Sequence, residues 1–124
     1  MLRTIAGAVA GVIVWAAVVT LLDFCLRHGW ADYAAVEKAM TFTIPMMAAR
    51  LTESGVSSIV SGWAAAAIGK RRLSALIAGV VLLAVFIPIH YSLLSKFPLW
   101  YHLTFLISLP VLSMLGGRLA KVSP

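Results

Sequence analysis

The chain has 124 residues, of which 62% are hydrophobic and 11% are charged, and its net charge is +6. Its apolar runs are too long for the core of a soluble protein of this size, which excludes a soluble domain and predicts one polytopic membrane domain over residues 1–124. The basic residues lie at predicted helix ends, as is typical of membrane proteins, so the charge does not indicate a nucleic-acid partner.

The first predicted span covers residues 4–26. This apolar run is longer than that of a secretory signal peptide, so we interpret it as a retained membrane helix. Gly7 and Gly11 form a Gly-x-x-x-Gly pattern, which permits close approach of a second helix or of a second copy of the chain. Near the other end of the span, Asp23 and Arg27 are spaced i, i+4, which predicts that their side chains can pair.

A polar stretch follows the first span and separates it from the second. Residues 32–40 are predicted to form a short helix in the outer membrane interface, with Asp32 as its N-cap. Thr43 is expected near the N-cap of the next helix, because Pro45 is favoured in a first helical turn.

The second predicted span, residues 46–69, is the least lipid-like. Small side chains recur at every fourth position along one half of this helix, and one such row is Ser54, Ser58, Gly62 and Ala66. The opposite half carries Val56, Ile59, Val60 and Trp63. Rows of small residues let helix backbones approach closely, so we expect the second span to lie at the centre of the bundle. The alternative is a polar pathway for an ion or small solute.

Arg50 and Glu53 are ionisable residues within this second span. They are spaced i, i+3, so they can pair on one face of the helix. Antiparallel packing of the first two spans would bring them to the depth of Asp23 and Arg27. This four-residue cluster has two interpretations, since intramembrane charges either neutralise one another to fix helix register or form a site for a substrate or proton.

The third and fourth spans are predicted at residues 73–94 and 99–119, with a kink at Pro88 and a tight turn at residues 96–98. His90 ends one span and His102 begins the next, so the two imidazoles could be close, and His28 lies on the same side. Histidine is a common ligand of metals and haem. No close-spaced histidine motif is present, however, and the sequence predicts no metal and no cofactor. Aromatic residues gather on the same side and predict an interfacial belt: Trp30, Tyr33, Tyr91, Trp100 and Tyr101.

The distribution of charge predicts the orientation of the four spans. The side that holds both termini carries six basic residues and no acidic residue: Arg3, Lys70, Arg71, Arg72, Arg118 and Lys121. On the other side, four basic residues are balanced by four acidic ones. Positive charge is enriched in cytoplasmic loops, so both termini are expected in the cytoplasm of, most simply, a bacterial inner membrane.

The sequence thus predicts an all-α, four-transmembrane-helix bundle with a short outer interfacial helix between the first two spans. No catalytic or nucleotide-binding motif is found, and the short loops leave little room for catalysis, which favours a protein that is not an enzyme. The leading hypothesis is function through helix–helix association in the bilayer, as a homo-oligomer or as a subunit of a larger membrane complex. The alternative is a small proton- or ion-coupled transporter or channel that uses the charged cluster.

Overall fold

The computed structural model describes residues 1–123, and this part of the chain is helical with no β-strand. Its five helices are α1 (Leu2–Gly29), α2 (Ala31–Glu37), α3 (Ile44–Gly69), α4 (Arg72–Ser92) and α5 (Leu99–Leu119). Three of them, α1, α4 and α5, are long and apolar enough to cross a membrane. The chain therefore has the features of a small membrane protein.

The helix α3 has the length of a membrane span but a more polar composition. Its 26 residues extend over roughly 39 Å, which exceeds the thickness of a hydrocarbon core. The serines and glycines of one face, together with Arg50 and Glu53, lower its hydropathy below that of the other three long helices. Polar groups are tolerated in a membrane helix where other helices cover them.

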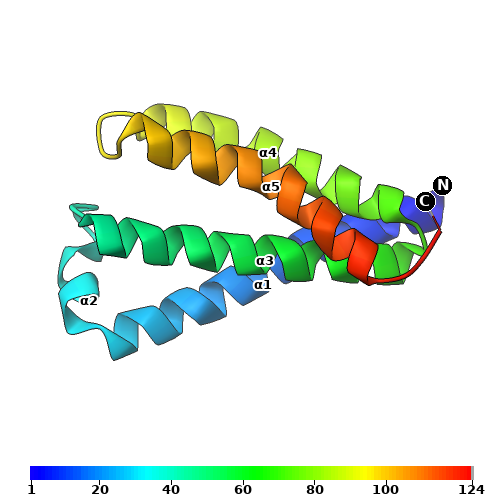
Figure 1. The fold of residues 1–124 in the computed structure, drawn as a ribbon, viewed down its shortest axis with the longest axis horizontal. Coiled ribbons are helices and arrows are strands. Elements are labelled where there is room, and N and C mark those ends of the chain that lie inside the picture. The colour runs from blue at the N-terminus through cyan, green and yellow to red at the C-terminus, as the bar shows by residue number, and fades with distance from the viewer. Residues whose placement is uncertain (124) are drawn as a thin grey trace.

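The four long helices form two antiparallel hairpins, α1 with α3 and α4 with α5 (Figure 1). The helix α3 contacts α1, α4 and α5, and so it occupies the centre of the arrangement. Both chain termini lie at one end, which we call the terminal end, where the hairpins come together. At the opposite end, which carries α2 and the α4–α5 connection and which we call the turn end, the hairpins diverge (Figure 1).

Small residues bring the helices into close contact toward the terminal end. A side chain added at Gly7 would meet the backbone of Ala65 and Gly69, and Ser61 donates a hydrogen bond to the Gly11 carbonyl at 2.6 Å. Gly62 lies directly against the backbone of Ser113 in α5. The terminal end is therefore closed by backbone-to-backbone packing.

The small-residue row of α3 is buried between helices of the same chain. Ser54, Ser58 and Ala66 are at most 1% exposed, and Gly62 is buried as well. On the opposite half, Val56 and Trp63 are 42% and 50% exposed. The polar half of α3 thus faces the bundle and its apolar half faces outward.

The helix boundaries differ from the expected ones mainly at the turn end. The helix α1 continues to Gly29, and the short α2 begins after Trp30, which is its N-cap. Asp32 lies inside the first turn of α2 and makes no capping hydrogen bond, so the expected capping role of Asp32 is wrong. Thr43 occupies the N-cap position of α3, although its side chain makes no capping hydrogen bond.

Candidate functional site

A cavity of about 440 Å³ lies between the two hairpins in the half of the molecule toward the turn end. All the long helices contribute to its wall, and so does the end of α2. Five charged residues line it: Asp23, Arg27, Glu37, Arg50 and Glu53. The structure therefore brings the four charged residues singled out in the sequence into one site and adds Glu37 to them.

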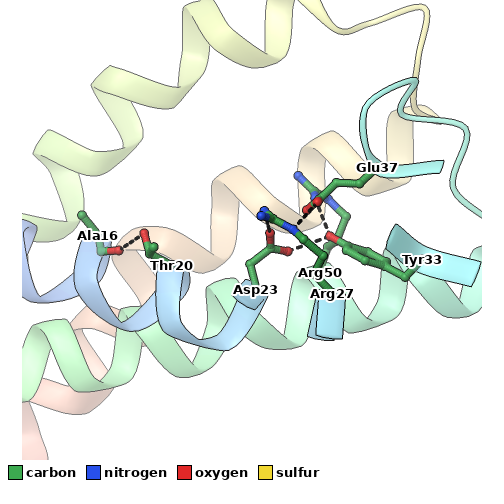
Figure 2. A network of polar contacts seen from close by, with 7 residues as sticks. All are labelled: Ala16, Thr20, Asp23, Arg27, Tyr33, Glu37 and Arg50. Carbon is green, nitrogen blue, oxygen red and sulfur yellow. Dashed lines mark hydrogen bonds and ion pairs between the residues drawn. The ribbon is translucent and has the colours of Figure 1, made fainter. Parts of the chain in front are cut away.

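Arg27 is the centre of a small ion-pair network at the rim of this cavity (Figure 2). Its Nη2 atom lies 3.0 Å from Asp23 Oδ2, and its Nε atom lies 2.6 Å from Glu37 Oε1. Burial raises the pKa of the Glu37 carboxyl above its ordinary value, against the opposing effect of Arg27. Both carboxylates are thus satisfied by a single guanidinium, which ties α2 to the end of α1.

Tyr33 links this network to α3 (Figure 2). Its hydroxyl donates to Asp23 Oδ1 at 2.8 Å and accepts a hydrogen bond from Arg50 Nη1 at 2.8 Å. Burial raises the pKa of the Tyr33 phenol, so the hydroxyl keeps its proton and remains a donor to Asp23. The Tyr33 hydroxyl therefore bridges Asp23 and Arg50 through two hydrogen bonds.

Arg50 is held by aromatic residues rather than by a carboxylate in direct contact. Its Nε atom donates to the Tyr101 hydroxyl at 3.2 Å, and its guanidinium carbon lies 4.7 Å from the centre of the Phe42 ring. Such a geometry is typical of a cation–π interaction. Within residues 1–123, no ion pair joins Arg50 to Glu53, so the i, i+3 pairing that the spacing permits does not form.

Glu53 is the charged residue of the cavity whose interactions are incomplete. Its side chain lines the cavity, the residue is 9% exposed, and its Oε1 atom is buried without a hydrogen-bond partner among the residues that the structure describes. The hydroxyl of the neighbouring Ser54 also lacks a partner. A buried polar group without a partner is costly, which makes Glu53 the residue most in need of a ligand or a proton.

Aromatic side chains form the apolar part of the cavity wall. Trp15, Phe86 and Phe105 line it beside Tyr101. The rings of Trp15 and Phe86 have centroids 5.0 Å apart, and those of Phe86 and Phe105 are 5.1 Å apart. Trp15 is fixed in place because its Nε1 atom donates to the Ser58 hydroxyl at 3.1 Å.

Two of the aromatic residues expected in an interfacial belt lie inside the molecule instead. Tyr33 is fully buried and Tyr101 is 2% exposed, whereas Tyr91 is 77% exposed. Both phenol hydroxyls accept hydrogen bonds from the Arg50 guanidinium, which draws the two tyrosines into the interior beside this partly buried charge. The belt prediction is therefore wrong for Tyr33 and Tyr101.

The imidazoles of His90 and His102 lie side by side, close to the cavity. Their Nδ1 atoms are 2.7 Å apart in a direct hydrogen bond across the α4–α5 hairpin, and the His102 Nε2 atom is buried without a partner. His28 is exposed, packs against Phe24 with a ring-centroid distance of 4.2 Å, and is not part of this pair. Residues 1–123 contain no group of three or more histidine, cysteine or acidic residues placed to hold a metal ion.

The comparisons with known proteins add no relationship to this description. No protein-family model, no curated protein and no solved structure matches the chain. The geometry of the cavity is therefore the basis for assigning a function.

The sequence reasoning missed Glu37, Tyr33 and Tyr101 as members of the site. Glu37 belongs to the polar stretch expected to form a short interfacial helix, and the tyrosines carry the composition signal of a membrane interface. The buried charge of Arg50 was the one available signal, since a guanidinium at membrane depth requires several acceptors.

Proposed function

We propose that this chain is a four-span membrane protein that binds a small solute in the charged cavity and passes it across the bilayer as a small proton- or ion-coupled transporter. The observation that carries the proposal is Glu53, a carboxylate in the cavity wall whose Oε1 atom accepts no hydrogen bond from residues 1–123. Unpaired intramembrane carboxylates are characteristic of proton and substrate pathways.

The cavity has the size and composition of a small-molecule site. Ligand sites commonly have volumes of ~300–1,000 Å³ and combine apolar walls with a few polar groups, and the volume here is about 440 Å³. Charged groups and the aromatic groups Trp15, Phe86 and Phe105 line the same cavity. A solute with a polar end and an apolar body would match both.

The hypothesis of function through helix–helix association has less support. It drew on the small-residue faces around Gly7 and Gly11 in α1 and around Ser58 and Gly62 in α3. These faces pack against other helices of the same chain, so they are not available to a second copy or to another subunit. Association would have to use the apolar outer surface, which is also the surface that contacts lipid.

The proposed membrane arrangement treats α3 as the fourth span, with both termini in the cytoplasm. The terminal end of the bundle carries basic residues, such as Arg71 and Arg118, and the turn end carries the acidic ones. This asymmetry supports the proposed orientation, because basic residues favour the cytoplasmic side. The cavity would then open toward the outside of the cell.

Cysteine labelling in intact cells tests this orientation. Cys25 is exposed and is first replaced by serine. An impermeant thiol reagent should then label Lys96→Cys at the turn end but not Arg71→Cys at the terminal end. Labelling of Arg71→Cys in sealed cells would contradict the proposed orientation.

The accessibility of the cavity tests transport more directly. Thr20 and the adjacent Leu21 are both exposed and lie at nearly the same depth, but Thr20 lines the cavity and Leu21 does not. A thiol in water ionises and reacts, and a thiol in lipid does not. In the Cys25→Ser background, a charged thiol reagent should therefore label Thr20→Cys and leave Leu21→Cys unlabelled.

The same two variants distinguish transport from binding alone. A transporter exposes its central site to each side of the membrane in turn, so Thr20→Cys should react in intact cells and also in inside-out vesicles. Reaction from the outer side alone would contradict transport. Equal reaction of Thr20→Cys and Leu21→Cys, or none at all, would contradict a water-accessible cavity.

A further inference from the structure

We propose that the ligand of the cavity is a monovalent organic cation with an apolar body, and that Glu53 is its counterion. This inference depends on the proposed function, because it names the substrate class of the same cavity. It follows from the balance of charges, from the aromatic wall and from the lack of a metal-binding group.

The balance of charge in the cavity leaves one acidic group without a cation. Arg27 is occupied by both Asp23 and Glu37, and Arg50 is bound to two phenols. Glu53 makes no ion pair in the part of the chain that the structure describes. A bound anion would be repelled by this carboxylate, whereas a bound cation would form an ion pair with it.

The aromatic side chains provide a second feature that favours a cation. Trp15, Phe86, Tyr101 and Phe105 all line the same cavity as Glu53. The face of an aromatic ring attracts a cation within about 6 Å, and tryptophan does so most strongly. Sites that bind quaternary ammonium groups combine such rings with a carboxylate, while the apolar body of the ligand is buried against the same rings.

A metal cation is disfavoured by the donors that are present. Ions such as Mg²⁺ and Zn²⁺ need several oxygen, nitrogen or sulfur ligands that converge on one point. No such group of three occurs among residues 1–123. An organic cation needs only one counterion and apolar contacts, and the cavity provides both.

The cation and a proton should compete for Glu53. Without a ligand, protonation neutralises the carboxyl group; on binding, the O–H bond breaks, the cation pairs with the carboxylate, and the proton passes to water. The other titratable groups of the wall are Asp23 and Arg27 from α1, Glu37 from α2, Arg50 from α3 and Tyr101 from α5. The α4 wall contributes Phe86, with His90 behind it at a ring distance of 6.2 Å.

Calorimetry on the purified full-length protein in detergent tests this proposal. Benzyltrimethylammonium is the probe, benzenesulfonate is the anion control, and protein-free micelles give the baseline. We expect the cation to bind, the anion to give the baseline signal, and cation binding to release up to one proton per site into a weakly buffered solution. Affinity for the cation should fall as the pH is lowered.

Two variants assign the binding to the cavity. Glu53→Gln should weaken binding by about tenfold or more and abolish proton release, because it removes the counterion and the titratable group. Asp32→Asn removes an exposed carboxylate outside the cavity and should leave binding and proton release unchanged. Equal binding of the anion, or unchanged binding by Glu53→Gln, would overturn the proposal.

The result can be separated from that of the proposed function. If benzyltrimethylammonium gives only the micelle baseline while Thr20→Cys still reacts from both sides of the membrane, the cation class is wrong and the transport proposal stands. If Thr20→Cys is unreactive, both the transport proposal and the cation proposal are wrong.

Discussion

Gly62→Ala in α3 is expected to lower the stability of the protein by about 1–3 kcal/mol, or to prevent folding, although it adds only one methyl group. The added Cβ would overlap the carbonyl group of Ser113 in α5. Neither backbone can yield without separating α3 from α5, and these two helices are in extensive contact. The thermal unfolding midpoint in detergent measures the effect.

Gly55→Ala in the same helix is the matched control. Its added Cβ would have the end of the flexible Leu112 side chain as its nearest neighbour, at 3.3 Å. Alanine also favours a helix over glycine by about 1 kcal/mol, so this variant should be as stable as the parent protein or more stable. Equal unfolding midpoints for Gly62→Ala and Gly55→Ala would contradict the close packing of α3 on α5.

Removing Arg50 is expected to destabilise the turn end through its two phenol partners. Arg50→Gln shortens the side chain and removes its charge, leaving the hydroxyl of Tyr101 without its donor in a residue that is 2% exposed. Hydrogen bonds to charged groups contribute ~1.5–3 kcal/mol each, and the loss should be of this order. Tyr33 keeps its hydrogen bond to Asp23 and should be affected less.

A double-mutant cycle identifies the partner of Arg50. Arg50→Gln and Tyr101→Phe should be coupled by ~0.5–3 kcal/mol in detergent stability, because each removes the same hydrogen bond. Tyr91 is 77% exposed, so a cycle of Arg50→Gln with Tyr91→Phe should give no coupling. A larger coupling between Arg50→Gln and Glu53→Gln than with Tyr101→Phe would show that the ion pair forms after all.

The stability of Glu53→Gln in detergent separates a structural role of Glu53 from a functional one. Within residues 1–123 the Oε1 atom of Glu53 has no hydrogen-bond partner to lose, and Glu53→Gln removes a charge from a buried side chain, so the variant should remain folded. Under the proposed function, Glu53→Gln should be folded but unable to transport the solute. A large loss of stability in Glu53→Gln alone would instead make Glu53 part of the scaffold.

The sequence by itself determined the helical character of the chain, the approximate limits of its long helices and the inward face of α3. The fourth expected span, residues 99–119, coincides with α5, and the row of Ser54, Ser58, Gly62 and Ala66 is buried. These features follow from local properties, since the length of an apolar run and the period of small residues along one helix are written directly in the order of residues.

Only the tertiary structure decided which polar groups meet. Arg50 is three positions from Glu53, but it contacts Tyr33 and Tyr101, which are 17 and 51 positions away. Glu37 reaches Arg27 because the chain turns back at Trp30, where the backbone leaves the helix. A buried charge takes whichever acceptors the folded chain brings within reach, and that choice depends on how hairpins far apart in sequence are placed, which no local pattern encodes.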